Sequence, residues 1–226
     1  MTTTPSVSQL TLVPTHFERE LLASFATADK QATLAVCGLG MALAGIHALR
    51  LIQQHHPQSV LLIGIAGALD DQLAVGSAYE FSSVACYGIG VGCGQQYQTI
   101  GELGWESWLN PCPDQPTIAE VLPLAIAPPA DATQQPARQL LSVTAASSNA
   151  NQIVWKREKF PLAVAEDMES YAVALACRLS GIPLRVIRGI SNRAGDRQRK
   201  NWRISEALQS AVSLIAPSIK SKPQCR

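Results

Sequence analysis

The fold is decided by residues 163–202, which read AVAEDMESYAVALACRLSGIPLRVIRGISNRAGDRQRKNW. The pattern predicts a helix, a tight stop, a buried strand and a polar loop. Glu166 and Asp167 place two carboxylates where that helix would begin, because the positive end of a helix dipole favours anions. Gly181 fits the position just after a helix, and Pro183 prevents the helix from continuing.

The second half of this stretch predicts a ligand-binding edge. Leu184, Val186 and Ile187 form a short apolar strand of the buried kind. Two polar residues stand out: Glu169, inside the apolar helix, and Asn192, just past the strand's carboxyl end. In open parallel sheets ligands bind at that edge, so both side chains are candidate site residues.

A second acidic candidate follows the first predicted strand, residues 10–13. Thr15 and Glu18 have the T-x-x-E spacing of a capping box at the start of a helix. An isolated capping box needs no other function. However, the position after the first strand of an α/β sheet also brings Glu18 to the carboxyl edge, so both interpretations stay open.

Two glycine-rich junctions lie between predicted elements. Residues 32–37 form a strand that runs into Gly38-Leu39-Gly40 and a helix at 42–54, and residues 59–63 form a strand that runs into a glycine turn at 64–69. Such turns expose backbone N–H groups and let a ligand approach closely. One of them alone means only a tight turn, but several converging on one edge predict a pocket for a flat, polar small molecule.

The rest of the chain predicts one domain, residues 1–226, with flexible tails at 1–8 and 218–226. Residues 87–138 are the least readable part, rich in Gly, Pro and Gln. The remaining expectations are strands at 78–85, within 118–126 and at 139–145, an exposed loop at 128–136, and helices at 153–159 and 201–215.

Composition excludes several classes of function. Of the 226 residues 47% are apolar and 15% charged, which is typical of a folded globular protein. A net charge of +1 gives no general drive toward nucleic acid or anionic membranes. No stretch approaches the roughly 20 apolar residues that a membrane span needs. The six cysteines lack CxxC spacing, and no third ligand accompanies His55-His56, so we expect a reduced cytoplasmic protein without a metal.

Taken together, several of these motifs resemble the purine nucleosidase/phosphorylase superfamily. The resemblance rests on the segments at 165–169, 188–192 and 64–67, and on Pro14-Thr15 followed by Glu18. The loop at 190–193 and the helix start at 202–204 are similar to the futalosine hydrolase branch of that superfamily. The resemblance implies a three-layer α/β/α fold with a central mixed, partly barrel-like sheet. It also implies a purine nucleoside as substrate, no cofactor, and a homo-oligomer.

The resemblance implies a role for each candidate. Glu18 would activate water at C1′, Glu169 would bind the ribose 2′- and 3′-hydroxyls, and Asn192 would contact the base at N7 and O6. Cleavage of the N-glycosidic bond passes through an oxocarbenium-like cation, which a carboxylate stabilises. Further substrate contacts are expected from the remaining candidates, Ile65, Gly67, Met168, Ser191 and Arg193.

Asn192 departs from the adenine-specific members, which have Asp at the matching place. An amide cannot protonate N7, but it can pair with a 6-oxopurine, so we expect futalosine as substrate and hypoxanthine as product. No arginine adjoins the two glycine turns, and Arg188 lies in the strand before the loop, which favours hydrolysis over phosphorolysis. Arg193 and Arg197 either bind the substrate's carboxylate or form a solvated loop. Another 6-oxopurine nucleosidase or phosphorylase, or a non-catalytic nucleoside-binding relative, remains an alternative.

Overall fold

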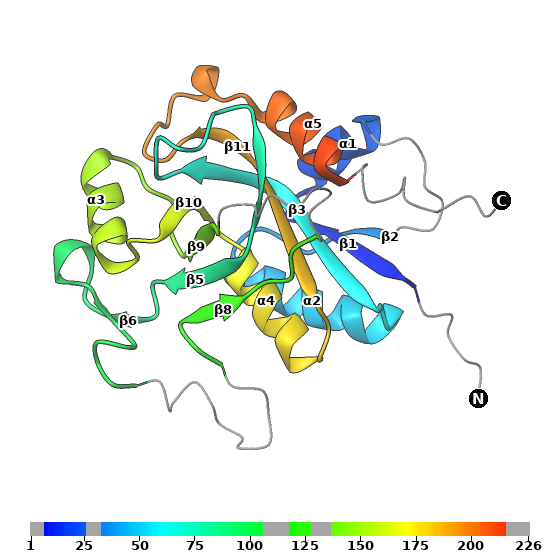
Figure 1. Ribbon diagram of the computed structural model, residues 1–226, viewed down its shortest axis with the longest axis horizontal. Coiled ribbons are helices and arrows are strands. Elements are labelled where there is room, and N and C mark those ends of the chain that lie inside the picture. Colours follow the sequence, from blue (N-terminus) through cyan, green and yellow to red (C-terminus); the bar gives the residue numbers. More distant parts are fainter. Residues whose placement is uncertain (1–6, 26–32, 106–117, 128–136, 216–226) are drawn as a thin grey trace.

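The computed structural model describes residues 7–25, 33–105, 118–127 and 137–215, and Figure 1 shows how they are arranged. The expected loop at 128–136 and most of the two expected tails lie outside these residues. The strands are β1 Gln9–Val13, β2 Thr33–Val36, β3 Ser59–Ala68, β4 Ala78–Phe81, β5 Ser83–Tyr87, β6 Gly90–Val91, β7 Gln98–Thr99, β8 Val121–Pro123, β9 Gln139–Val143, β10 Ala163–Asp167 and β11 Leu184–Arg193. The helices are α1 His16–Phe25, α2 Met41–His55, α3 Ala150–Lys159, α4 Ser170–Leu179 and α5 Ile204–Ile215, with short 3-10 turns at Gly94–Gln96 and Arg199–Asn201.

Strand β3 is the centre of a mixed sheet. It pairs in parallel with β1 and β11, and its last two residues pair antiparallel with β10. From β10 the sheet continues through β9 and β5 to β8, while β4 covers the outer side of β11. An isolated parallel bridge between Ala125 and Arg185 joins the chain after β8 back to β11. The expected partly barrel-like, mixed sheet is therefore confirmed.

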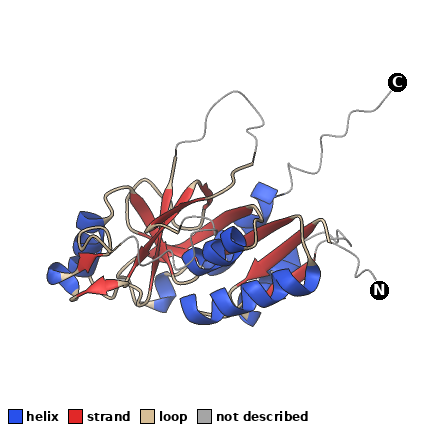
Figure 2. Cartoon of the chain, turned by 90° about the horizontal axis from the view of Figure 1, so that it is seen from below, coloured by secondary structure: helices blue, strands red, loops and turns tan. Residues whose placement is uncertain are grey.

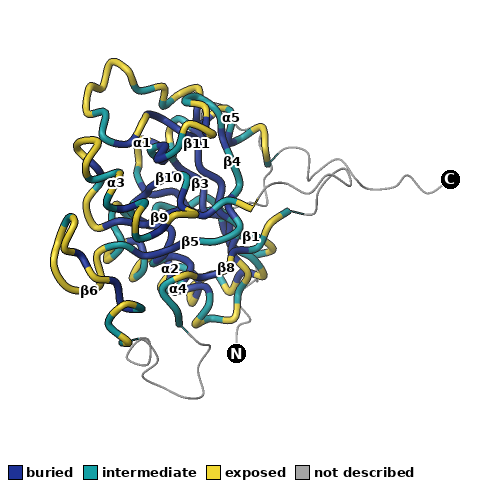
Figure 3. Tube along the Cα trace, turned by 60° about the vertical axis from the view of Figure 1, so that its left-hand side comes forward, coloured by how far each residue is buried: buried dark blue, intermediate teal, exposed yellow. Residues whose placement is uncertain are grey.

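Helices cover both faces of this sheet. Val60 and Leu62 of β3 pack in one apolar cluster with α2 and α4, whereas Leu61 and Ile63 pack in another with α1 and α5. This alternation is what a strand buried on both faces requires. Figure 2 shows the strands running between helices, and Figure 3 shows buried chain at the centre of the molecule. The three-layer α/β/α arrangement is thus confirmed.

The expected helix start at Glu166 and Asp167 is wrong. These residues end strand β10, and α4 begins only at Ser170, so Glu169 precedes the helix instead of lying inside it. Glu166 is buried against Lys156, with 2.8 Å between Oε2 and Nζ, and its Oε1 accepts the Ser147 N–H at 2.7 Å. Pairing of β10 with β9 and β3, which lie far away in the sequence, outweighs the local helix-start pattern.

Three strand boundaries also differ from expectation. The predicted glycine turn at 64–69 lies mostly inside β3, which runs on to Ala68. Asn192 lies within the last two residues of β11, next to a register shift between Ile190 and Asn192, instead of beyond the strand. The strand expected at 78–85 is divided at Ser82 into β4 and β5, which belong to different parts of the sheet.

Candidate active site

Glu18 lies at the junction between β1 and α1. Its backbone N–H donates to Thr15 Oγ1 at 3.2 Å, as in a capping box. Its carboxylate makes two further contacts: Oε2 accepts the Thr15 hydroxyl at 2.6 Å, and Oε1 accepts the backbone N–H of Ile65 on β3 at 3.0 Å. The side chain is buried, so Glu18 is both part of a helix cap and a carboxylate held inside the sheet edge.

Glu169 comes from a distant part of the chain and reaches the same region. It is the residue before α4, and its Oε1 accepts the backbone N–H of Gly40 at 3.0 Å. Gly40 has a φ of 83°, which favours glycine, so the Gly38-Leu39-Gly40 turn orients this carboxylate. Burial, together with the nearby charge of Asp167, raises the pKa of Glu169 to about 7, although Arg188 and the Gly40 N–H oppose the shift.

Arg188 joins these acids, and the sequence did not single it out as a site residue. It is fully buried on β11, and its Nη2 lies 2.5 Å from Asp167 Oδ2 and 3.4 Å from Glu169 Oε2. Burial by itself would lower the pKa of Arg188, but the charges of the surrounding carboxylates outweigh it and raise the pKa. Its Nε and Nη1 have no hydrogen-bond partner among the described residues.

The surroundings of Gly64 show that Glu18 lies close to Arg188. A Cβ added to Gly64 would lie 2.2 Å from Arg188 Nη1 and 2.8 Å from Glu18 Oε1, so the two groups flank one point on β3. Gly64 is therefore not a turn residue. It is a glycine inside a strand because the guanidinium and the carboxylate occupy the space of a side chain.

The result is a buried charge cluster, defined here as Glu18, Asp167, Glu169 and Arg188. It contains three carboxylates and one guanidinium, so it has more acidic than basic groups. Asp167 is also held by Ser142 Oγ at 2.5 Å and by the Ser170 N–H at 3.1 Å. An isolated buried charge is costly, and such a cluster survives only when its members are paired and hydrogen-bonded. We therefore regard it as the candidate site.

Asn192 lies at the end of the strand that carries Arg188. Its Oδ1 accepts the Ser191 hydroxyl at 2.7 Å, while its Nδ2 donates to the carbonyls of Arg193 at 2.6 Å and Asp196 at 3.5 Å. The amide hydrogens are therefore used by its own loop, and the second lone pair of Oδ1 is the group left to meet a ligand. Asn192 lies four positions after Arg188 along β11, a Cα distance of roughly 13 Å.

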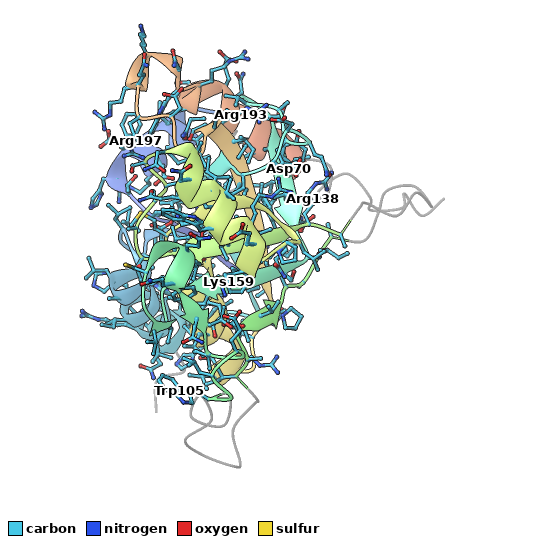
Figure 4. All side chains as sticks on the ribbon, turned by 90° about the vertical axis from the view of Figure 1, so that its left-hand side faces the viewer. Asp70, Trp105, Arg138, Lys159, Arg193 and Arg197 are labelled. Carbon is cyan, nitrogen blue, oxygen red and sulfur yellow. The ribbon has the colours of Figure 1, made fainter. Side chains whose placement is uncertain are left out.

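The other residues that the sequence predicts to contact the substrate each have defined contacts in the fold. Met168 is half-buried and packs against the apolar cluster beneath α3. Ile65 gives its backbone N–H to Glu18, Ser191 holds the Asn192 amide, and Gly67 pairs with Asn192 across the sheet. Arg193 points outward and forms an exposed ion pair with Asp71, on the part of the molecule where Figure 4 labels it.

The described residues hold neither a metal-binding cluster nor a membrane span. No group of three or more His, Cys, Asp or Glu side chains there is arranged to hold a metal ion. Within the same part of the chain, no helix has the length and apolar character to cross a membrane.

The chain belongs to the phosphorylase superfamily, whose family model matches residues 6–79 and 138–217. Among curated proteins, it is 29% identical over 171 residues to futalosine hydrolase of Streptomyces coelicolor, covering 74% of this chain and 69% of that protein. It is 25% identical over 199 residues to the 5′-methylthioadenosine/S-adenosylhomocysteine nucleosidase of Staphylococcus haemolyticus, covering 85% and 82%.

Solved structures agree on the fold. The 5′-methylthioadenosine/S-adenosylhomocysteine nucleosidase of Helicobacter pylori, solved with butyl-thio-DADMe-Immucillin-A, superposes with a TM-score of 0.70 at 14% identity. The match covers 96% of this chain and 99% of that one. Futalosine hydrolase of Helicobacter pylori gives 0.67 at 16% identity, covering 93% and 97%. The fold is therefore shared by relatives that carry two different names.

Proposed function

We propose that this protein is a nucleosidase that hydrolyses the N-glycosidic bond of futalosine and releases hypoxanthine. The observation that carries the proposal is the meeting of Glu18, Glu169 and Arg188 in one buried charge cluster. The curated relatives support an N-glycosidic hydrolase, since they are futalosine hydrolases and methylthioadenosine/S-adenosylhomocysteine nucleosidases. Hydrolysis of futalosine would place the reaction in the alternative menaquinone pathway, in the cytoplasm.

Glu18 and Arg188 together can orient an attacking water. Each Glu18 oxygen already accepts one hydrogen bond, which leaves a further lone pair on each to receive a water proton. Arg188 Nη1, beside Glu18 Oε1, is a donor without a partner among the described residues. A water that accepts from Nη1 and donates to Glu18 has its oxygen lone pair directed away from both. On attack, its oxygen bonds to C1′, its proton passes to Glu18, and the C1′–N9 electron pair leaves with the base.

In this proposal Glu169 holds the ribose. One oxygen is fixed by the Gly40 N–H, and the other lies on the Arg188 side of the cluster. A carboxylate accepts two hydroxyl protons, and its charge favours the positive ribosyl group that forms as the bond breaks. Because burial raises the pKa of Glu169 to about 7, the ionised form increases through neutral pH.

The cluster also favours water over phosphate, but for a reason different from the one expected. The expectation was that no arginine adjoins the two glycine turns, but the fold brings Arg188 beside Gly64 and Glu18. Its charge is already outnumbered by Asp167, Glu169 and Glu18. A net negative site would therefore repel a phosphate ion, whereas it would not repel a neutral water molecule.

The base-recognition role of Asn192 needs revision. Donation from Nδ2 to O6 would require this amide to give up its bond to the Arg193 carbonyl. We propose instead that Oδ1 accepts the N7–H of the leaving purine. An amide oxygen can accept that proton but cannot supply it, so the proton comes from solvent. The preference for a 6-oxopurine then rests on the resemblance and on the futalosine hydrolases among the relatives.

The test is incubation with futalosine, inosine and methylthioadenosine, each with and without phosphate, followed by chromatography of the free base. We expect hypoxanthine from futalosine without phosphate, and loss of release in Glu18→Gln and in Glu169→Gln with the fold retained. A requirement for phosphate would make the protein a phosphorylase, and faster release of adenine from methylthioadenosine would make it a nucleosidase of the other kind. Binding without any release in wild type would identify a non-catalytic relative.

The expected homo-oligomer also remains a proposal. Leu39, Leu43 and Ile46 are more than half exposed on one side of α2 and the turn before it. Water-exposed apolar side chains at helical spacing are typical of a surface that another chain covers. Light scattering during size-exclusion chromatography measures the oligomeric state directly, and a monomer at micromolar concentration would contradict the proposal.

A further inference from the structure

The loop after β11 concentrates positive charge beside Asn192. Residues 193–203 contain five basic residues and one acidic residue, in a chain whose net charge is only +1. The basic residues are Arg193, Arg197, Arg199, Lys200 and Arg203. Such a local excess attracts an anion, whereas the charge cluster at Arg188 repels one.

This loop is anchored to Asn192. The carbonyl of Asp196 accepts the indole Nε1–H of Trp202 at 3.0 Å and also the Nδ2 of Asn192 at 3.5 Å. The Asp196 carboxylate accepts the Gln198 N–H and the Asn201 amide, each at 2.8 Å, which closes the loop on itself. The Trp202 ring and the Asn192 amide therefore meet at one carbonyl oxygen.

Two arginines of the loop are already paired, and Arg197 is not. Arg193 pairs with Asp71, and Arg203 pairs with Glu206. The Arg197 guanidinium lies 5.4 Å from the centre of the Trp202 ring and has no carboxylate partner among the described residues. Stacking on an indole holds a guanidinium flat and leaves its N–H edge available to a carboxylate. Figure 4 shows Arg193 and Arg197 toward the same end of the molecule.

We propose that Arg197, held by Trp202, binds the carboxylate of an aromatic substituent on the nucleoside and selects substrates that carry one. This inference rests on the proposed function and adds a specificity-determining residue to it. A guanidinium binds a planar carboxylate through two parallel hydrogen bonds, and the half-buried indole adds a flat apolar surface beside it. Arg193, which the sequence suggested for the same role, already forms an ion pair with Asp71.

The experiment compares futalosine, which carries a benzoate, with inosine, which does not. Arg197→Gln removes one charge from the loop. Arg203→Gln removes the same charge from a residue already paired with Glu206 and is the matched control. We expect Arg197→Gln to raise KM for futalosine about tenfold or more, as for loss of a charge-assisted bond, with kcat within about twofold. KM for inosine should change less than about twofold, and Arg203→Gln should not distinguish the two substrates.

Equal changes for both substrates, or the same change in Arg203→Gln, would overturn the inference. Failure of wild type to cleave either nucleoside would overturn the proposed function instead. In that case calorimetric titration with the same two nucleosides decides the inference. The inference is supported if the wild type binds futalosine more tightly than inosine and Arg197→Gln abolishes this preference. It is refuted if the preference is unchanged in Arg197→Gln, or if the wild type shows no preference.

Discussion

Gly64→Ala is the sharpest test of the charge cluster, because it adds one methyl group at its centre. The new Cβ would lie 2.2 Å from Arg188 Nη1, 2.8 Å from Glu18 Oε1 and 2.9 Å from the Pro14 ring. Gly64 lies inside β3 and its φ is not in the left-handed region, so the backbone accepts alanine without strain. Any effect of the substitution therefore comes from the collision with these neighbours.

The collision cannot be relieved cheaply. Arg188 is fully buried and fixed to Asp167 at 2.5 Å, and Glu18 is fixed by Ile65 and Thr15. Overpacking of this kind costs about 1–3 kcal/mol of stability. Displacement of a general base loses about 10²–10⁴ in rate, so we expect release of hypoxanthine from futalosine to fall at least about a hundredfold.

The assay combines urea unfolding, followed by circular dichroism, with base release measured on the same preparations. Gly45→Ala is the matched control, because its added methyl would lie 3.2 Å from Ala172 Cβ, between α2 and α4 and away from the cluster. The gain in helix propensity, about 1 kcal/mol, offsets that tight contact. If Gly64→Ala unfolds at the wild-type urea concentration and keeps wild-type turnover, the close approach of Glu18 and Arg188 is wrong.

Two further predictions concern buried charges. Glu169 has a folded pKa of about 7, above its ordinary value, so its ionised form destabilises the protein. That destabilisation is complete above pH 7 and disappears as the pH falls toward the ordinary value. Glu169→Gln should therefore raise the free energy of unfolding at pH 8, by at most on the order of 3 kcal/mol, and by less than about 1 kcal/mol at pH 5. A difference between the two proteins that stays constant from pH 5 to 8 in urea titrations would contradict the raised pKa. Lys156→Met leaves Glu166 buried without its partner and should cost about 3–5 kcal/mol in the same assay. The double variant with Glu166→Gln should recover part of this loss, and a double variant as unstable as the single one would argue against the pair.

Local patterns in the sequence were sufficient for the elements that position Glu18. The apolar run of β1, the Thr15–Glu18 capping pair and the start of α1 are all short-range signals, and the structure has each of them. The same holds for the stop at Gly181 and the apolar strand β11. Such signals depend on neighbours within a few residues, which is why the sequence shows them.

Strand β10 and the position of Gly64 could not be predicted in this way. Glu166 and Asp167 look like the acidic first turn of a helix until Lys156 and Arg188 are brought to them by the fold. Gly64 looks like a turn residue because nothing near it in sequence shows that a guanidinium will fill its side-chain space. Both features are set by contacts between residues far apart in the chain, which propensity does not contain.

Arg188 did leave a signal that could have been used. An arginine in the middle of a strand with buried apolar neighbours is unusual, because a charge placed there needs carboxylate partners. The segment Glu166-Asp167-Met168-Glu169 is the acid-rich part of the same stretch, and two of its carboxylates lie on Arg188. An anomalous arginine in a buried strand, together with a nearby run of acids, therefore predicts a charge cluster from the sequence alone.

The excess of acid in this cluster has a consequence for the proposed reaction. Burial, and after it the charges of Asp167 and Glu18, makes the ionised form of Glu169 costly and raises its pKa. A neutral nucleoside does little to reduce that cost. A ribosyl group that becomes positive as its bond to the base breaks reduces it directly, because the new charge faces unbalanced carboxylates. The same carboxylate charges that destabilise the folded protein thus stabilise the transition state more than they stabilise the bound substrate. A reaction is accelerated by this difference between transition state and bound substrate.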